Sequence, residues 1–368
     1  MKKYSFIILC LLLLCIVYSC KTDTYSCQGE KKLQISSLTL DTINVTAPEN
    51  TSYYGMSGLS GDSLFFYDKA LSYLYHISVD GKTGSRKLGL GHSSKELPCK
   101  NLDVCYDNKE QKLIGLGSTL DVYIYDEPKD VVRKLDLASE EGKKDYTSPY
   151  AYSTWDEFIM YANNGKVYYN ILGEAEGARI TDEEDYFKNA AILMELNLKT
   201  GVQKPVGHYS DYYDQNKKHV RHLPHIYFDI DDDGTFYVTF QADPSIYHYS
   251  KDFELLDTFG FEGTDMDTHY SECALGAEGF GNAYVQDMDK VGYYYWLKRA
   301  NGYTFRSYRT SGDAVNDRLQ VYDCEYNLIA DVDVPKNFRV AGYIAPYFIT
   351  QINTPEEEDN LYFYRFKL

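Results

Sequence analysis

One short motif recurs six times along this 368-residue chain, and it constrains the fold more than any other feature. Each copy begins with an alternating run of apolar or aromatic residues, continues through a polar turn, and returns in a second short run. This is the pattern of a β-hairpin. The first runs are residues 73–77, 122–125, 193–196, 246–249, 319–322 and 361–364. The returning runs of the first five copies are residues 85–89, 131–135, 202–206, 255–259 and 328–332.

Each hairpin is preceded by further strand-like runs, which gives about four strands per unit. A further apolar stretch lies upstream of most of these runs, such as residues 102–106 and 225–229. Six four-stranded units predict an all-β chain that folds as a six-bladed β-propeller. A single large sandwich or barrel does not explain why the same hairpin occurs six times. The preceding runs are residues 63–67, 112–116, 158–161, 235–240, 293–296 and 347–350.

The sixth copy lacks its last strand, because the chain ends at Leu368. Residues 32–45 contain a strand-like run with no hairpin of its own. We therefore predict that this N-terminal strand closes the last blade by pairing with residues 361–367, so that the propeller spans residues 32–368. Extra material is expected at residues 171–190, as a surface loop with a short helix, and at residues 298–317.

The N-terminus has the pattern of an export signal. Lys2 and Lys3 precede an apolar run at residues 6–17, which is too short to span a bilayer as an anchor. The run ends in Val17-Tyr18-Ser19-Cys20, which resembles a bacterial lipobox. That resemblance implies a signal peptide at residues 1–19, diacylglycerol on the Cys20 sulfur and a lipid-anchored tether at residues 20–31. The alternative is an ordinary signal peptide with an incidental cysteine.

The lipobox, the length and the degenerate blades together resemble the uncharacterised lipoproteins of Bacteroidota that have TolB-like six-bladed propellers. The resemblance covers nearly all of the chain after residue 20, but it rests on pattern and not on a diagnostic motif. It implies a propeller held at the outer membrane by lipid on Cys20, on either the periplasmic or the surface face. It transfers no catalytic residue.

Composition limits the partners of this chain. The net charge of −18 argues against binding to nucleic acid, which needs a basic surface. The 38 tyrosines fit many half-buried strand positions better than one sugar-binding surface, because they are spread over the whole sequence. Cys99 and Cys105 are close enough to pair across a hairpin, although we interpret the cysteines after Cys20 as mostly buried and inert.

Two segments contain candidate ligand-binding residues. His219, Arg221, His222 and His225 belong to the densest basic stretch of the sequence, which would suit an anion such as a uronic acid if it faces the central funnel. Three histidines at this spacing would hold zinc on a helix, but Pro224 favours a solvated loop between blades.

Tyr293 and Trp296 lie in an aromatic run that forms either a sugar-stacking platform or blade packing. Residues 229–234 begin like a calcium loop, but the position for the final glutamate is Phe240, so a β-turn is the better interpretation. The sequence therefore predicts no metal and no cofactor.

The sequence favours a binding module for a glycan or an envelope protein partner. It contains neither GxSxG nor HExxH, the motifs of two large hydrolase groups. A glycan hydrolase or lyase with its site in the central funnel is the first alternative, since paired carboxylates cannot be located from sequence. A scaffold or sensor in an outer-membrane complex is the second.

Overall fold

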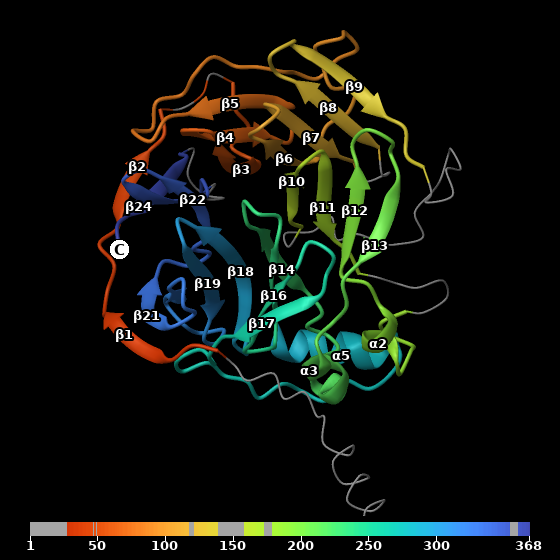
Figure 1. Ribbon diagram of the computed structural model, residues 1–368, viewed down its shortest axis with the longest axis vertical. Coiled ribbons are helices and arrows are strands. Elements are labelled where there is room, and N and C mark those ends of the chain that lie inside the picture. The colour runs from red at the N-terminus through yellow and green to blue at the C-terminus, as the bar shows by residue number, and fades with distance from the viewer. Residues whose placement is uncertain are drawn as a thin grey trace, which may run out of the picture.

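Six small antiparallel sheets surround one central axis in the computed structural model (Figure 1). The structure describes residues 28–46, 48, 50–117, 121–138, 158–172, 179–353 and 360–368. Each inner strand contacts the inner strand of the next blade, and the last contacts the first, which closes a ring. This confirms the prediction of a six-bladed β-propeller. The inner strands are β3 (Gly55–Ser60), β6 (Asp103–Asp107), β10 (Met160–Asn163), β14 (Ile226–Ile230), β18 (Tyr293–Ala300) and β22 (Val340–Ile344).

The remaining strands continue outward from the axis in each blade. The second strands are β4 (Ser63–Asp68), β7 (Lys112–Leu116), β11 (Lys166–Asn170), β15 (Phe236–Phe240), β19 (Tyr303–Arg309) and β23 (Tyr347–Thr350). The third strands are β5 (Tyr73–Ile77), β8 (Val122–Asp126), β12 (Leu193–Asn197), β16 (Ile246–Tyr249), β20 (Asp317–Tyr322) and β24 (Tyr362–Phe366). Blades two to five have a fourth strand, which is β9 (Val131–Leu135), β13 (Gln203–Val206), β17 (Leu255–Phe259) or β21 (Leu328–Val334).

Three blades differ from the strand assignment that the sequence indicates. In blade one the expected returning run, residues 85–89, forms no strand, and only Lys87 forms a bridge, with Leu74. Residues 158–161 and 293–296 were expected to be second strands, but residues 160–161 belong to the inner strand β10 and residues 293–296 to the inner strand β18. The real second strands follow after two-residue turns, Asn164-Gly165 and Asn301-Gly302. Both residues of each turn have positive φ (51° and 75°, 48° and 81°), which is the hairpin geometry that Asn-Gly favours. The extra material expected at residues 298–317 therefore contains the end of β18, the whole of β19 and the start of β20.

The N-terminal segment closes the ring, as predicted, but it also reaches further. β2 (Asp41–Asn44) pairs antiparallel with β24 of blade six. β1 (Lys31–Ile35) does not join that blade; it adds to β21 of blade five in parallel. Gln28 forms a bridge with Phe259 of blade four, so the folded part begins before residue 32. Residues 28–45, called the strap below, therefore contact the outer strands of three blades.

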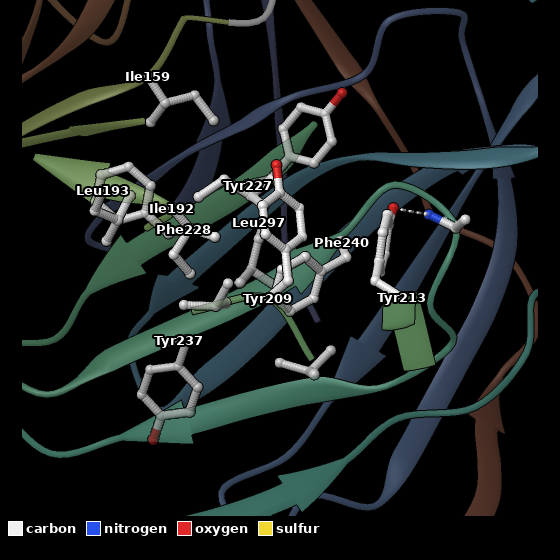
Figure 2. Close-up of a cluster of buried hydrophobic side chains, with 14 of the residues drawn as sticks. Ile159, Ile192, Leu193, Tyr209, Tyr213, Tyr227, Phe228, Tyr237, Phe240 and Leu297 are labelled. Carbon is white, nitrogen blue, oxygen red and sulfur yellow. Dashed lines mark hydrogen bonds between the residues drawn. The ribbon is translucent and has the colours of Figure 1, made fainter. Parts of the chain in front are cut away.

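Aromatic packing between blades makes up much of the core. Figure 2 shows the largest cluster, in which Tyr209 and Tyr213 pack against Phe240. The Tyr213 hydroxyl lies inside this cluster and accepts a hydrogen bond from the Ala242 backbone N–H at 3.1 Å. Tyrosine suits such a position, because its ring fills the core while its hydroxyl satisfies a buried backbone group.

Short helices lie outside the sheets, beside blades three and four (Figure 1). α2, which begins at Tyr186, falls inside the insert where a short helix was expected. No helix in the described part of the chain is long and apolar enough to span a bilayer. The helices are α2 (Tyr186–Asn189), α3 (Asp211–Gln215), α4 (Lys217–Val220) and α5 (Ala277–Asp287).

Candidate functional site

A cavity of about 880 Å³ lies where the six inner strands meet. Residues of all six inner strands line it, so it occupies the axis of the ring. Its volume is within the range of small-molecule sites, about 300–1,000 Å³. A ligand in this central cavity would contact residues that are far apart in the sequence and that only the ring brings together.

The lining of the central cavity is rich in charge. Among the described lining residues, acidic and basic side chains are equal in number, although the whole chain has 55 acidic and 37 basic residues. The acidic excess of the chain is therefore absent from this described part of the cavity wall. The charged lining residues are Asp103, Asp107, Asp229, Asp231, Asp232, Lys69, Lys109, Lys298, Arg299 and Arg339.

A buried ion pair joins blades four and five in this lining. Lys298 Nζ lies 2.8 Å from Asp229 Oδ1, and the Arg299 backbone N–H donates to the other carboxylate oxygen at 2.7 Å. Lys298 also lies 4.5 Å from the centre of the Tyr161 ring of blade three. Burial raises the pKa of Asp229 above its usual value, while Lys298 opposes this effect. Both carboxylate oxygens are thus already occupied by cation or backbone donors.

A second ion pair lies where the inner strands begin. Lys69 Nζ of blade one is 2.7 Å from Asp103 Oδ1 of blade two. Burial raises the pKa of Asp103, again opposed by its lysine. The Tyr54 ring lies 5.7 Å from Lys69 Nζ and is 56% exposed, although it lines the cavity. An exposed tyrosine ring beside paired charges is suited to stack on a sugar ring while the charges hydrogen-bond its hydroxyls.

Of the six residues predicted as ligand-binding candidates, Trp296 is the one that lines the central cavity. Its indole N–H donates to the Val340 carbonyl of blade six at 2.8 Å, and the Arg339 guanidinium lies 5.3 Å from its ring. A β-bulge interrupts β18 between Tyr294 and Trp296. Tyr294, Tyr295 and Trp296 are all buried, and Tyr293 lines a second, smaller cavity instead.

Comparisons with solved structures find similar proteins from Bacteroides. A member of the DUF4221 family from Bacteroides vulgatus is 12% identical, with a TM-score of 0.64, over 90% of this chain and 98% of that one. A protein from Bacteroides fragilis described as exported is 13% identical, with a TM-score of 0.53, over 92% and 99%. At this identity the likeness shows the fold alone. No protein-family model matches the chain, and no curated protein matches it.

The basic segment predicted as a ligand site is not part of the central cavity lining. It was expected to be a solvated loop, but residues 217–220 form α4, and Arg221 and His222 are buried. Arg221 donates to the backbone carbonyls of Ile180 and Glu183 at 2.6 and 2.9 Å, which ties the segment to the neighbouring insert. His219 is exposed and lies 3.2 Å from the Tyr270 carbonyl, and His225 is half-buried.

His222 takes part in a buried polar cluster on α5. Its Nε2 lies 2.8 Å from Asp287 Oδ2, and Ser271 donates to the same carboxylate through its N–H and its hydroxyl. Burial lowers the pKa of His222 below its usual value near 6.5, although Asp287 opposes this effect. The folded protein therefore holds this imidazole neutral under conditions where the unfolded chain would protonate it.

This shift predicts acid sensitivity. At a pH between the folded and unfolded pKa values of His222, the unfolded chain binds more protons at this residue than the folded protein does. The contribution of His222 to the free energy of unfolding is therefore complete above about pH 6.5. It falls as the pH drops below that value, by up to about 1.4 kcal/mol per pH unit. We expect His222→Gln to reduce the loss of unfolding free energy between pH 7.5 and 5.5 in urea titrations. The exposed His208→Gln is the control and should leave the slope unchanged. An equal slope in both variants would contradict the assignment.

The structure also shows the outcome for the candidate calcium loop and for the cysteines. Residues 231–234 form the turn between β14 and β15, with the Gly234 N–H donating to the Asp231 carbonyl. No group of three His, Cys, Asp or Glu in the described ranges is arranged to hold a metal ion. Cys99 and Cys105 are both free, so the possible hairpin disulfide is not formed. Cys20 lies outside the described residues.

Proposed function

We propose that this protein is an exported binding module of the bacterial cell envelope that holds a glycan in its central cavity. The observation that carries this proposal is the composition of the cavity wall. Exposed and half-buried aromatic rings, among them Tyr54 and Tyr161, alternate there with paired charges that can both donate and accept hydrogen bonds. Sugars need both kinds of contact, because each ring has an apolar face and an edge of hydroxyls.

Several features favour binding over turnover. The two cavity aspartates with raised pKa, Asp103 and Asp229, each have a lysine ammonium within 2.8 Å. A carboxyl group that donates a proton to a leaving group is usually kept protonated, and a neighbouring lysine opposes this. The same ion pairs stabilise the contact between neighbouring blades, so they also preorganise the wall for a ligand.

The location of the protein at the outer membrane is part of the same proposal. The lipobox-like end of the apolar run implies lipid on Cys20, and one structural neighbour is described as exported. The strap begins at Gln28, eight residues after Cys20, and an extended chain of that length spans at most about 28 Å. A lipid on Cys20 would therefore hold the propeller close to the outer membrane, where envelope glycans are abundant.

The test is a thermal-shift screen with soluble oligosaccharides from bacterial and host polysaccharides, followed by calorimetry on the sugar with the largest effect. Tyr54→Ala should weaken the binding of that sugar about tenfold, or about 1.4 kcal/mol, because an exposed stacking ring is removed without disturbing the core. Tyr284→Ala, which removes a tyrosine that is 38% exposed on α5 and absent from the lining, is the matched control.

The outcomes separate the candidate functions. Equal affinity of the two variants would exclude the central cavity as the glycan site. Release of new reducing ends during the titration would instead support a hydrolase, and Asp229→Asn would then be the variant to assay. Stable capture of an envelope protein with no response to any sugar would favour the scaffold.

A further inference from the structure

A second cavity of about 200 Å³ lies beside the central one, between blades five and six. Tyr293 is the first residue of β18, and Arg339 directly precedes β22, so this cavity opens where the inner strands begin. Arg339 lines both cavities. The side chains that matter for its chemistry are Tyr293, Tyr295, Arg309, Asp317, Lys336 and Arg339.

The second cavity is positively charged in a strongly acidic protein. Among the described residues that line it, three are cationic and one is acidic, so their formal charge is +3 − 1 = +2. The one carboxylate among them, Asp317, is held by neutral donors, the Tyr295 hydroxyl at 2.8 Å and the Asn337 backbone N–H at 2.7 Å. The positive charge of the cavity is therefore not neutralised by an ion pair to Asp317.

Arg309 is fixed in place by neutral acceptors, and within the described part of the chain no carboxylate pairs with it. It donates to the carbonyls of Met288 and Gly312 at 3.1 and 3.3 Å and to the Tyr293 hydroxyl at 3.1 Å. A guanidinium has five N–H donors, so these three bonds orient the group and leave donors for a ligand. Lys336 is exposed, and within the described ranges no carboxylate lies within 4.0 Å of its ammonium.

The shape of these groups indicates a particular kind of anion. A planar guanidinium matches a planar carboxylate and binds it through two parallel hydrogen bonds. The Tyr293 ring lies 5.3 Å from the Arg309 guanidinium carbon, which places a flat apolar surface next to the charge. The volume admits one sugar-sized group. We infer that this second cavity binds the carboxylate of an acidic sugar, a hexuronate, with Arg309 and Lys336 contacting the carboxylate and Tyr293 packing on the sugar ring.

The experiment uses the purified protein and single sugars. D-glucuronate and D-galacturonate are titrated by NMR, with D-glucose and D-galactose as neutral controls and with acetate and inorganic phosphate as simple anions. We expect saturable binding of a hexuronate with a Kd of about 1 mM and a loss of at least about tenfold in Lys336→Glu. Lys199→Glu makes the same charge change on an exposed residue of blade three and should retain the wild-type Kd within about twofold.

Each other result overturns the inference. Equal weakening in the two lysine variants would mean that only the overall charge matters. Competition by acetate or phosphate as strong as that by hexuronate would define a general anion site and not a sugar site. Absence of saturable binding would remove the site altogether. Lys336 does not line the central cavity, so none of these negative results would contradict the proposal that a glycan binds there.

Discussion

A chain that begins at Val45 is expected not to fold as a soluble monomer. The loss of β2 removes four residue pairs with β24 and exposes that strand as an open edge at the seam of the ring. Four backbone hydrogen bonds contribute about 4 kcal/mol at about 1 kcal/mol each, and the packing of Ile43 on the cluster of blades one and six is lost as well. This total approaches the whole stability of a typical domain, about 5–15 kcal/mol.

A chain that begins at Leu38 is the matched control. It loses Gln28 and β1, which is mostly exposed and adds only to the outer edge of blade five, but it keeps β2. We expect this chain to remain a monomer by size-exclusion chromatography, with a modest decrease in melting temperature measured by circular dichroism. If the chain from Val45 also has a melting temperature within about 3 °C of that of the full protein, the pairing of β2 with β24 does not stabilise the ring.

The fold could be predicted because its signals are local. Each third strand and its returning partner form a hairpin with a polar turn, and the missing partner of the sixth hairpin required a strand from elsewhere in the chain. β2 supplies it. The position of β1 was not predictable in the same way, because its parallel pairing with β21 leaves no periodic signal and depends on the direction in which the strap leaves blade six.

The candidate site could not be predicted, because it depends on which strand of each blade is innermost. Residues 158–161 and 293–296 have the pattern expected of second strands, and in that assignment Tyr161 and Lys298 would not line the axis, as they do in the structure. The Asn164-Gly165 and Asn301-Gly302 turns could have indicated the correct strand order, because an Asn-Gly turn predicts that a second strand of a hairpin follows it. The sequence gives less indication that Tyr54 lines the cavity, because this residue is marked only by its position directly before the first inner strand.

The basic segment at residues 217–225 was predicted as a ligand site but has a structural role. Charge density alone suggested a binding loop, yet Arg221 is used to hold backbone carbonyls and His222 to hold Asp287. Arg309 and Lys336 carry less conspicuous charge in the sequence because they are 27 residues apart, but the structure places both on one cavity wall. A cluster in space is therefore the better indicator of an anion site in this protein than a cluster in sequence.

The fully buried Arg306 is expected to be the most sensitive single residue of the fold. Its guanidinium donates to the carbonyls of Pro244 and Phe261 at 2.8 and 2.7 Å and to Gln320 Oε1 at 2.6 and 3.0 Å. It also lies 3.9 Å from the centre of the Tyr294 ring. Within the described ranges no carboxylate pairs with it, so its charge is stabilised by neutral oxygens.

Arg306→Met should therefore lower the free energy of unfolding by about 4 kcal/mol. The methionine fills most of the space, but it removes the charged donor of the Pro244 and Phe261 carbonyls and of Gln320 Oε1, and a hydrogen bond from a charged group contributes about 1.5–3 kcal/mol. The matched control is Arg133→Met on β9, an exposed arginine whose change should be within about 0.5 kcal/mol. Urea titrations followed by circular dichroism measure both. A loss below about 1 kcal/mol in Arg306→Met would show that water or neighbouring donors replace the guanidinium, and that the contact between blades four and five does not depend on it.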